Sequence, residues 1–433
     1  MEEFLMNRQS NSSREDGEIR DISDEIKYDL NVDDDETVEE NTLVRFYSTI
    51  STRGKELLRR DGYEFTFDKP SKLEEADGEM MLIYCSEFGK NILLQYGKEV
   101  CVDGTFKSSP KNFCQIYTIN IIIDRCAIPA VYGILRSKRH ATYESFFGIV
   151  HDRIPDWFPE ILMTDFEISA MDAIKQVYKT GLYLVNSKVF PEIVINGCLF
   201  HMAQAIFRKI QQLPNLLALF KNNTIARIKL KSLISLAFVP TDNVYEYFCL
   251  LFYQFELNPD IEALMKYFVK TWLGCRQIWN TQPIPPLYDE ELGDYGQIDQ
   301  FIRNWIIAEG LQHRNALFSP PMWNMCNRLE MDLCRTNNSL ESWHMNWNSH
   351  FRSGFHPKLS EVVKKIEFEE THWKLLVEEF QISPANVIRG RGQKRRAAYV
   401  EQDANLLELY NTRCERHPFE YLKSVAHRMP DPI

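Results

Sequence analysis

The sequence predicts an α/β protein whose core is a mixed sheet between helices. Three observations favour this class. Three apolar runs rich in β-branched and aromatic residues follow one another between residues 98 and 136, with only short turns between them. Helix-like and strand-like patterns then alternate up to residue 214. From about 215 to 335 the pattern is helical, which predicts that a large helical insertion interrupts the sheet.

The first three runs are expected to form an antiparallel meander. The segments between them, KSSPKN and DRCA, have the composition of turns. Connections this short join antiparallel neighbours, because parallel strands need a longer crossover. The runs are EVCVDGTF (99–106), FCQIYTINIIID (113–124) and IPAVYGILR (128–136).

The next part of the chain, which ends at Pro214, alternates helices with strands. Short apolar runs predict buried strands, and longer runs with a helical rhythm predict helices. The resulting order, βββαβαβα, is the order that an RNase H-like mixed sheet produces. The segments are ATYESFFGIVHDRIP (helix), EILMTD (strand), SAMDAIKQVYKTG (helix), EIVINGCLF (strand) and HMAQAIFRKIQQLP (helix).

A capped helix is predicted after the helical insertion. In TNNSLESWHMNWNSHF, Asn338 or Ser339 can cap the helix, and Glu341 falls in its first turn. We expect this helix to return the chain to the core. The predicted divisions are a disordered acidic tail (1–40), a segment of short strands (41–70), a connecting helical or linker segment (71–97), the α/β core (98–214), the helical insertion (215–335), the end of the core (336–380) and a basic tail (381–433).

The negative charge of the chain is concentrated in its first 40 residues. The 433 residues carry a net charge of −11, and residues 1–40 alone hold 15 Asp/Glu and 4 Lys/Arg. The rest of the chain is therefore neutral. A segment so acidic and so poor in apolar residues is expected to be disordered. The neutral body permits DNA binding through local basic patches but does not argue for it.

Composition argues against a membrane or secreted protein. No apolar run approaches the ~18 residues of a membrane helix, and the first residues lack the basic-then-apolar pattern of a signal peptide. The ten cysteines are scattered singly, without a C-x-x-C pair. This spacing is typical of a reducing compartment, the cytosol or nucleus.

Two aspartates directly follow strand-like runs, Asp103 after EVCV and Asp165 after EILMT. Each has a structural interpretation: Asp103 can open a turn, and Asp165 can cap the helix that begins near Ser169. In the predicted sheet, however, their strands are neighbours, and two carboxylates held close repel unless a cation intervenes. The pair therefore suggests a site for Mg²⁺, which prefers oxygen ligands.

Four segments around these aspartates resemble the MULE (Mutator-like element) transposase domain. They are VDGTFKSSPKNFCQIYTINI, PAVYGILRSKRHATYESFF, MTDFEISAMDAI and GCLFHMAQAIFRKI. The resemblance covers residues 98–213 and extends to 355. It implies an RNase H-like catalytic core with an Asp-Asp-Glu triad that holds Mg²⁺ or Mn²⁺, and a C-x-x-H signature between the second and third acids.

The resemblance assigns the first two acids to Asp103 and Asp165. The third falls on Glu341 in RTNNSLESWHMNW, 176 positions after the second, with Glu330 and Glu309 as rivals. This segment departs from the family at one position, because a histidine, residue 344, stands where an asparagine is more usual.

The C-x-x-H signature falls on Cys198 and His201 in CLFH. Residues three apart can share one face of a helical turn and so contact a common atom. Two ligands do not complete a zinc site, which has four. A buried cysteine beside a hydrogen-bonded histidine and a zinc-type pair therefore both remain open.

A second resemblance concerns FYSTISTRGKELLRRDGYEF (46–65), which is similar to the opening of a FLYWCH-type zinc finger. The half of that module with the cysteine and histidine ligands is missing between Lys69 and Met81. The segment is therefore interpreted as a remnant that binds no zinc.

Basic residues near the predicted site are candidates for DNA contacts. The run RGRGQKRR (389–396) is typical of a nuclear-import signal or of an arm that contacts phosphates. Trp272, Trp279, Trp305 and Trp323 are instead expected in the core of the helical insertion. The candidate DNA-binding residues are Arg136, Lys138, Arg139, Arg208, Lys209, Arg395 and Arg396.

These features predict a nuclear DNA transposase that cuts and joins DNA strands with Mg²⁺ or Mn²⁺. Its expected partners are transposon ends, target DNA and further copies of itself. A domesticated DNA-binding or regulatory protein without transposition is the alternative, and a nuclease of the same fold acting on RNA or hybrids is a third.

Overall fold

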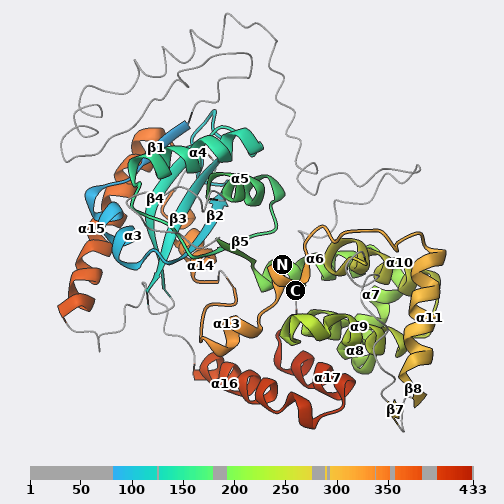
Figure 1. Cartoon of the computed structure of the whole chain (residues 1–433). Coiled ribbons are helices and arrows are strands. Elements are labelled where there is room, and N and C mark those ends of the chain that lie inside the picture. The colour runs from blue at the N-terminus through green and yellow to red at the C-terminus, as the bar shows by residue number, and fades with distance from the viewer. Residues whose placement is uncertain are drawn as a thin grey trace, which may run out of the picture. The chain divides into compact units, whose positions relative to one another are not determined.

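Figure 1 shows the computed structural model of the chain. It describes residues 81–123, 126–178, 193–275, 288–289, 293–336, 338–351, 356–382 and 397–431. The predicted acidic tail (1–40), the FLYWCH-like remnant (41–70) and the basic run with Arg395 and Arg396 lie outside the described residues. None of the helices in the described ranges combines the length and hydrophobicity of a membrane-spanning helix.

A six-stranded mixed sheet forms the centre of the α/β part. Its strand order is β1-β4-β3-β2-β5-β6. The pairs β1/β4, β4/β3 and β3/β2 are antiparallel, and β2/β5 and β5/β6 are parallel. The predicted α/β class with a mixed sheet is confirmed. The strands are β1 (Met81–Tyr84), β2 (Glu99–Thr105), β3 (Gln115–Ile123), β4 (Cys126–Leu135), β5 (Ile161–Thr164) and β6 (Val194–Gly197).

Helices account for most of the remaining described chain. Short 3-10 turns (Leu236–Phe238, Thr241–Asn243 and Arg413–Glu415), a π turn (Val269–Leu273) and a two-stranded ladder of β7 (Tyr288–Asp289) and β8 (Gly293–Asp294) complete it. The helices are α3 (Glu87–Tyr96), α4 (His140–Arg153), α5 (Ile168–Tyr178), α6 (Leu199–Gln211), α7 (Pro214–Asn222), α8 (Thr224–Ser235), α9 (Val244–Tyr253), α10 (Pro259–Phe268), α11 (Tyr295–Ala308), α12 (Pro320–Trp323), α13 (Cys326–Glu330), α14 (Asn338–Ser349), α15 (Leu359–Ile382), α16 (Ala397–Asn411) and α17 (Pro418–Arg428).

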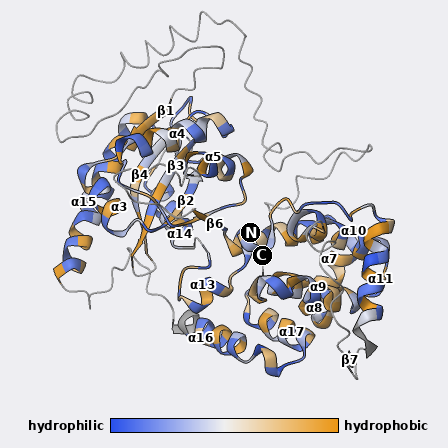
Figure 2. Ribbon diagram, viewed as in Figure 1, coloured by the Kyte–Doolittle hydropathy of each residue, from blue (hydrophilic) through white to orange (hydrophobic). Residues whose placement is uncertain are grey.

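Helices cover both faces of the sheet (Figure 1). On one face, Tyr117 of β3 packs edge-on against Phe146 and Phe147 of α4, with ring centroids 5.7 and 6.1 Å apart. On the other face, Tyr132 of β4 packs against Trp343 and Trp347 of α14. Because both faces are covered, β4 is buried along its whole length and reads as a continuous apolar run. Figure 2 shows hydrophobic colours along much of the central strands, whereas each helix alternates between hydrophobic and hydrophilic residues.

Strand β1 lies at the edge of the sheet, beside β4. The hydroxyl of Tyr84 donates to Glu370 Oε2 of α15 at 2.8 Å. Ser86 follows the strand, caps α3 through the N–H of Gly89 and also contacts Glu370. The sequence assigned this region to a connecting segment (71–97), whereas the described part of it forms a strand and a helix of the core.

The helical part has a tryptophan core joined to the sheet. Trp323 is fully buried, and its Nε1 atom donates to the carbonyls of Trp272 and Phe318 at 2.9 and 3.1 Å. Trp305 is buried as well. Phe166, directly after β5, contacts the rings of Trp272 and Phe318, each at 4.8 Å between centroids. These tryptophans are core residues, as predicted, and Trp279 lies outside the described residues.

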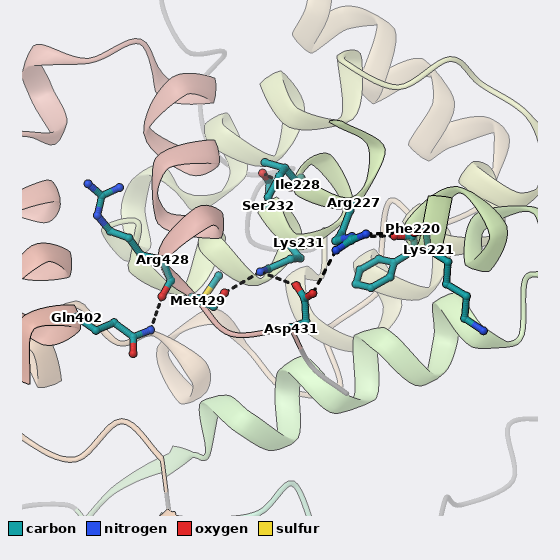
Figure 3. Close-up of polar contacts among 10 residues, drawn as sticks. All are labelled: Phe220, Lys221, Arg227, Ile228, Lys231, Ser232, Gln402, Arg428, Met429 and Asp431. Carbon is teal, nitrogen blue, oxygen red and sulfur yellow. Dashed lines mark hydrogen bonds and ion pairs between the residues drawn. The ribbon is translucent and has the colours of Figure 1, made fainter. Parts of the chain in front are cut away.

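Residues 397–431 pack against the helical part. The sequence assigned them to a basic tail (381–433). Helix α17 packs against α8 and α9. Buried Lys231 of α8 donates to the carbonyl of Met429 at 2.7 Å and to Asp431 Oδ1 at 2.9 Å, and Arg227 lies 3.5 Å from Asp431 Oδ2 (Figure 3). Asp431 thus joins the end of the chain to two basic residues of one helix.

Candidate active site

Asp103 and Asp165 lie at corresponding places on neighbouring parallel strands. The ladder of β2 and β5 ends at the pair Cys101 and Met163. Continuing its offset by two residues sets Asp103 opposite Asp165, which directly follows β5. Adjacent strands lie about 4.8 Å apart, so the two carboxylates start from backbones one strand spacing apart. The backbone N–H of Gly104 donates to Asp103 Oδ1 at 2.7 Å, and the Thr164 hydroxyl to Asp165 Oδ1 at 3.2 Å.

Helix α14 brings Glu341 near the carboxyl ends of β2 and β5. Glu341, His344 and Asn348 are spaced i, i+3 and i+7 and so share one helix face. Asn348 exchanges a hydrogen bond with the Thr105 hydroxyl of β2 at 3.1 to 3.2 Å. His344 Nδ1 lies 3.8 Å from Asp103 Oδ2. The face that carries Glu341 therefore rests on the strand that carries Asp103.

Asp165 and Glu341 act electrostatically on Asp103. Burial raises the pKa of Asp103 well above its usual range, and the charges of Asp165 and Glu341 raise it further. The Gly104 N–H and the charge of Lys138 partly offset this rise. Burial also raises the pKa of Glu341. A buried carboxylate whose ionisation is opposed by two other acids favours a cation beside it.

The three acids offer the type of ligand atom that a divalent cation binds. Carboxylate oxygens are the ligands that Mg²⁺ and Mn²⁺ prefer, and Asp103, Asp165 and Glu341 supply them in this region. In the described part of the chain, however, no group of three His, Cys, Asp or Glu residues stands close enough to hold a metal ion. The three acids are thus gathered at one edge without being set at ligand distance.

The two rival acids are engaged elsewhere. Glu330 of α13 accepts a hydrogen bond from the hydroxyl of Tyr410 in α16 at 2.7 Å. Glu309 pairs with Lys266 of α10. Neither contact involves the sheet, and neither acid is among the charges that act on Asp103.

Cys198 and His201 lie at the start of α6, which directly follows β6. Cys198 is fully buried and occupies the N-cap position, and its N–H donates to the carbonyl of Thr164 at 2.9 Å. The charge of His201 lowers the pKa of Glu341. His201 Nδ1 is buried, and among the described residues it meets no hydrogen-bond partner. Cys198 is thus bonded to the residue that precedes Asp165, and His201 acts electrostatically on Glu341.

A polar network beside Asp165 was not singled out from the sequence. The hydroxyl of Tyr143 donates to Glu167 Oε1 at 2.9 Å and accepts from Gln115 Nε2 at 2.7 Å. Lys138 Nζ lies 3.6 Å from Glu167 Oε2. Burial and the charge of Asp165 raise the pKa of Glu167 to about 7. The motif MTDFE contains the signal, a second acid two positions after Asp165, but its partners come from distant segments.

The candidate DNA-binding residues divide into two places. Arg136, Lys138 and Arg139 lie in the connection from β4 to α4, and the charge of Lys138 reaches Asp103. Arg208 and Lys209 lie in the last turn of α6, about 15 Å along the helix from its start at the acids. The first group adjoins the candidate site, and the second lies at the opposite end of α6.

Comparison with known proteins adds no relative. No family model matches the chain, and a search of curated proteins finds no match.

Proposed function

We propose that the protein is a MULE-type DNA transposase with an RNase H-like core. One observation carries the proposal: strands β2 and β5 set Asp103 and Asp165 side by side, and α14 adds Glu341 from far along the chain. The order β4-β3-β2-β5-β6, an antiparallel meander followed by two parallel strands, supports an RNase H-like core. A nuclear location and assembly of several copies on DNA belong to the same proposal.

The side chains would work as follows. Asp103, Asp165 and Glu341 would hold Mg²⁺ or Mn²⁺, with Asp103 oriented by the Gly104 N–H and Asp165 by the Thr164 hydroxyl. When bound, such ions activate the attacking oxygen and stabilise the leaving oxygen of a phosphodiester. In the first reaction water attacks phosphorus and the 3′-oxygen leaves. In the second, the freed 3′-hydroxyl attacks a phosphodiester of the target strand.

Strand cleavage tests this function. DNA carrying an element end is incubated with the full chain and Mg²⁺ or Mn²⁺, and nicked and joined products are measured. Asp165→Asn is expected to lower cleavage by about 100-fold or more, because it removes a charged ligand at the reacting centre. Equal cleavage by wild type and D165N would refute the assignment.

A domesticated DNA-binding protein without transposition is the second candidate. It is favoured by the absence, within the described ranges, of three ligands at metal-binding distance, and by the loss of the zinc-finger ligands from the sequence. In this case wild type and D165N would bind DNA equally and neither would cut it. Terminal inverted repeats flanking the gene would instead favour the transposase.

A further inference from the structure

An exposed phenylalanine stands next to the candidate acids. Phe106 directly follows β2, three residues after Asp103, and 45% of its surface is exposed. A single exposed apolar side chain needs no explanation by itself. Phe106 lies at the carboxyl end of the strand that carries Asp103. It is therefore a candidate contact for a substrate bound at the acids.

A lysine from another element lies over this ring. Lys138, in the connection from β4 to α4, places Nζ 4.1 Å from the centroid of Phe106. An ammonium at this distance from an aromatic face is held by the charge distribution of the ring. The same Nζ lies 3.6 Å from Glu167 Oε2. The ring and the cation are thus a defined pair with fixed neighbours.

Electrostatics ties this pair to the acids. Burial raises the pKa of both Asp103 and Glu167, and the charge of Lys138 offsets part of each rise. A phosphate that entered the site would therefore meet a cation beside the carboxylates, and the base attached to it would meet an exposed ring. Aromatic rings and cations in this combination are the elements that bind single-stranded nucleic acid without reading its sequence.

We propose that Phe106 and Lys138 form a platform for an unpaired DNA nucleotide next to the phosphate that is cut, with the ring stacking on its base and the ammonium contacting its phosphate. This inference rests on the proposed function and names the form of its substrate: DNA whose strands are open at the cleavage point.

A second phenylalanine and lysine pair provides a matched control. Phe368 of α15 is 47% exposed, and Lys365 Nζ lies 5.2 Å from its ring centroid. The two phenylalanines are about equally exposed, whereas Lys365 is buried and pairs with Glu369, and none of the three candidate acids belongs to α15. Phe368→Ala is therefore expected to leave nucleic-acid binding unchanged.

Binding is measured by fluorescence anisotropy in EDTA, in a D165N background that excludes cleavage. Phe106→Ala is expected to weaken binding of single-stranded DNA about tenfold and to affect paired DNA less. Lys138→Met is expected to weaken the binding of both single-stranded and paired DNA. The slope of log affinity against log salt concentration is expected to fall by about the value of one phosphate contact. Melting temperatures equal to that of the parent protein show that these variants fold.

Phe106→Trp supplies a site-specific signal. It is expected to keep the affinity, and its added fluorescence is expected to be quenched by single-stranded DNA. Unchanged single-strand affinity in F106A, an unquenched F106W, or tighter binding of RNA than of DNA would overturn the inference. If F106W is quenched but the parent enzyme never cuts DNA, the platform stands and the proposed function fails. If cutting depends on Asp165 but F106A binds single-stranded DNA normally, the proposed function stands and the platform fails.

Discussion

The Nδ1 atom of His344 lies 3.8 Å from the Oδ2 atom of Asp103, at the point where helix α14 meets strand β2. The two residues are 241 positions apart in the chain. Their contact accompanies the Asn348–Thr105 hydrogen bond one helical turn away. The candidate site is thus assembled by docking a helix on a strand, and several expectations follow from the way it is docked.

Divalent metal is expected to stabilise the wild-type protein. A cation that relieves the repulsion around Asp103 binds only the folded state, so Mn²⁺ at about 100 times its dissociation constant should add about 2.7 kcal/mol. Glu341→Gln should lose most of this gain, whereas Glu330→Gln should keep it, because Glu330 instead binds Tyr410. Thermal unfolding with Mn²⁺ or EDTA measures the effect. Loss of the gain in E330Q but not in E341Q would move the third acid to Glu330.

Asn348→Ala is expected to weaken metal binding without unfolding the protein. It removes the hydrogen bonds that the Asn348 amide exchanges with the Thr105 hydroxyl, which costs about 1–2 kcal/mol, and loosens the helix face that carries Glu341. Asn346→Ala, two positions away on α14, is the matched control. Titration calorimetry gives the metal affinity, and urea unfolding gives the stability. Equal metal affinities in the two variants would show that the Asn348 contact does not position Glu341.

Gly89 and Gly148 are expected to respond oppositely to alanine. A Cβ at Gly89 in α3 would meet the backbone carbonyl of Ala130 in β4, which cannot move aside without shifting the sheet. A Cβ at Gly148 in α4 meets nothing within 4 Å. Gly89→Ala should therefore destabilise the fold by about 1–3 kcal/mol, and Gly148→Ala should stabilise it by up to about 1 kcal/mol. Urea unfolding of both variants measures the difference, and a neutral G89A would mean that α3 is free to shift.

Asp431 is expected to stabilise the helical part from the end of the described chain. Lys231 is only 5% exposed and relies on Asp431 and the Met429 carbonyl (Figure 3). Asp431→Ala leaves a buried ammonium short of its counter-charge, which should cost about 1–3 kcal/mol. Asp260→Ala, which breaks a contact to exposed Asn215, should cost less than about 0.5 kcal/mol. Similar losses in both variants would show that the Lys231 contact adds no stability.

Cysteine alkylation is expected to separate exposed from buried thiols. Burial raises the pKa of Cys85, Cys275 and Cys326 to about 12, so almost none of each thiol is ionised at pH 8. Cys414 is exposed. Iodoacetamide should modify Cys414 first, and Cys414→Ser should remove the fast phase. Rapid labelling of Cys85 in the native protein would show that the edge of the sheet opens.

Local patterns were sufficient to predict the sheet but not its edge. Strands β2 to β6 each coincide with an apolar run, and the β2/β5 neighbourhood followed from their order. Strand β1 was missed because four residues, Met81–Tyr84, carry no periodicity, and its pairing with β4 joins segments some 50 positions apart. Helices α16 and α17 were missed because the adjacent basic run dominated the composition, although Leu406, Leu409 and Tyr410 form a buried helical stripe.

The sequence was sufficient to predict the candidate acids but not the side chains that contact them. Asp103 and Asp165 stand out because each comes at the end of a strand-like apolar run, and Glu341 stands out as the acid in the first turn of α14. No spacing in the sequence indicates that Tyr143 would reach Glu167 or that His344 would face Asp103. Such contacts depend on how helices dock on the sheet, and docking is set by packing between distant segments.

The late position of Glu341 has a consequence for synthesis of the protein. A ribosome that adds 5–20 residues per second needs roughly 10 to 35 seconds to pass from Asp165 to Glu341. During that interval the strands that carry two acids have already been made, and the third acid does not yet exist. Under the proposed function, a chain that is terminated before residue 341 cannot cut DNA, because it lacks the third acid.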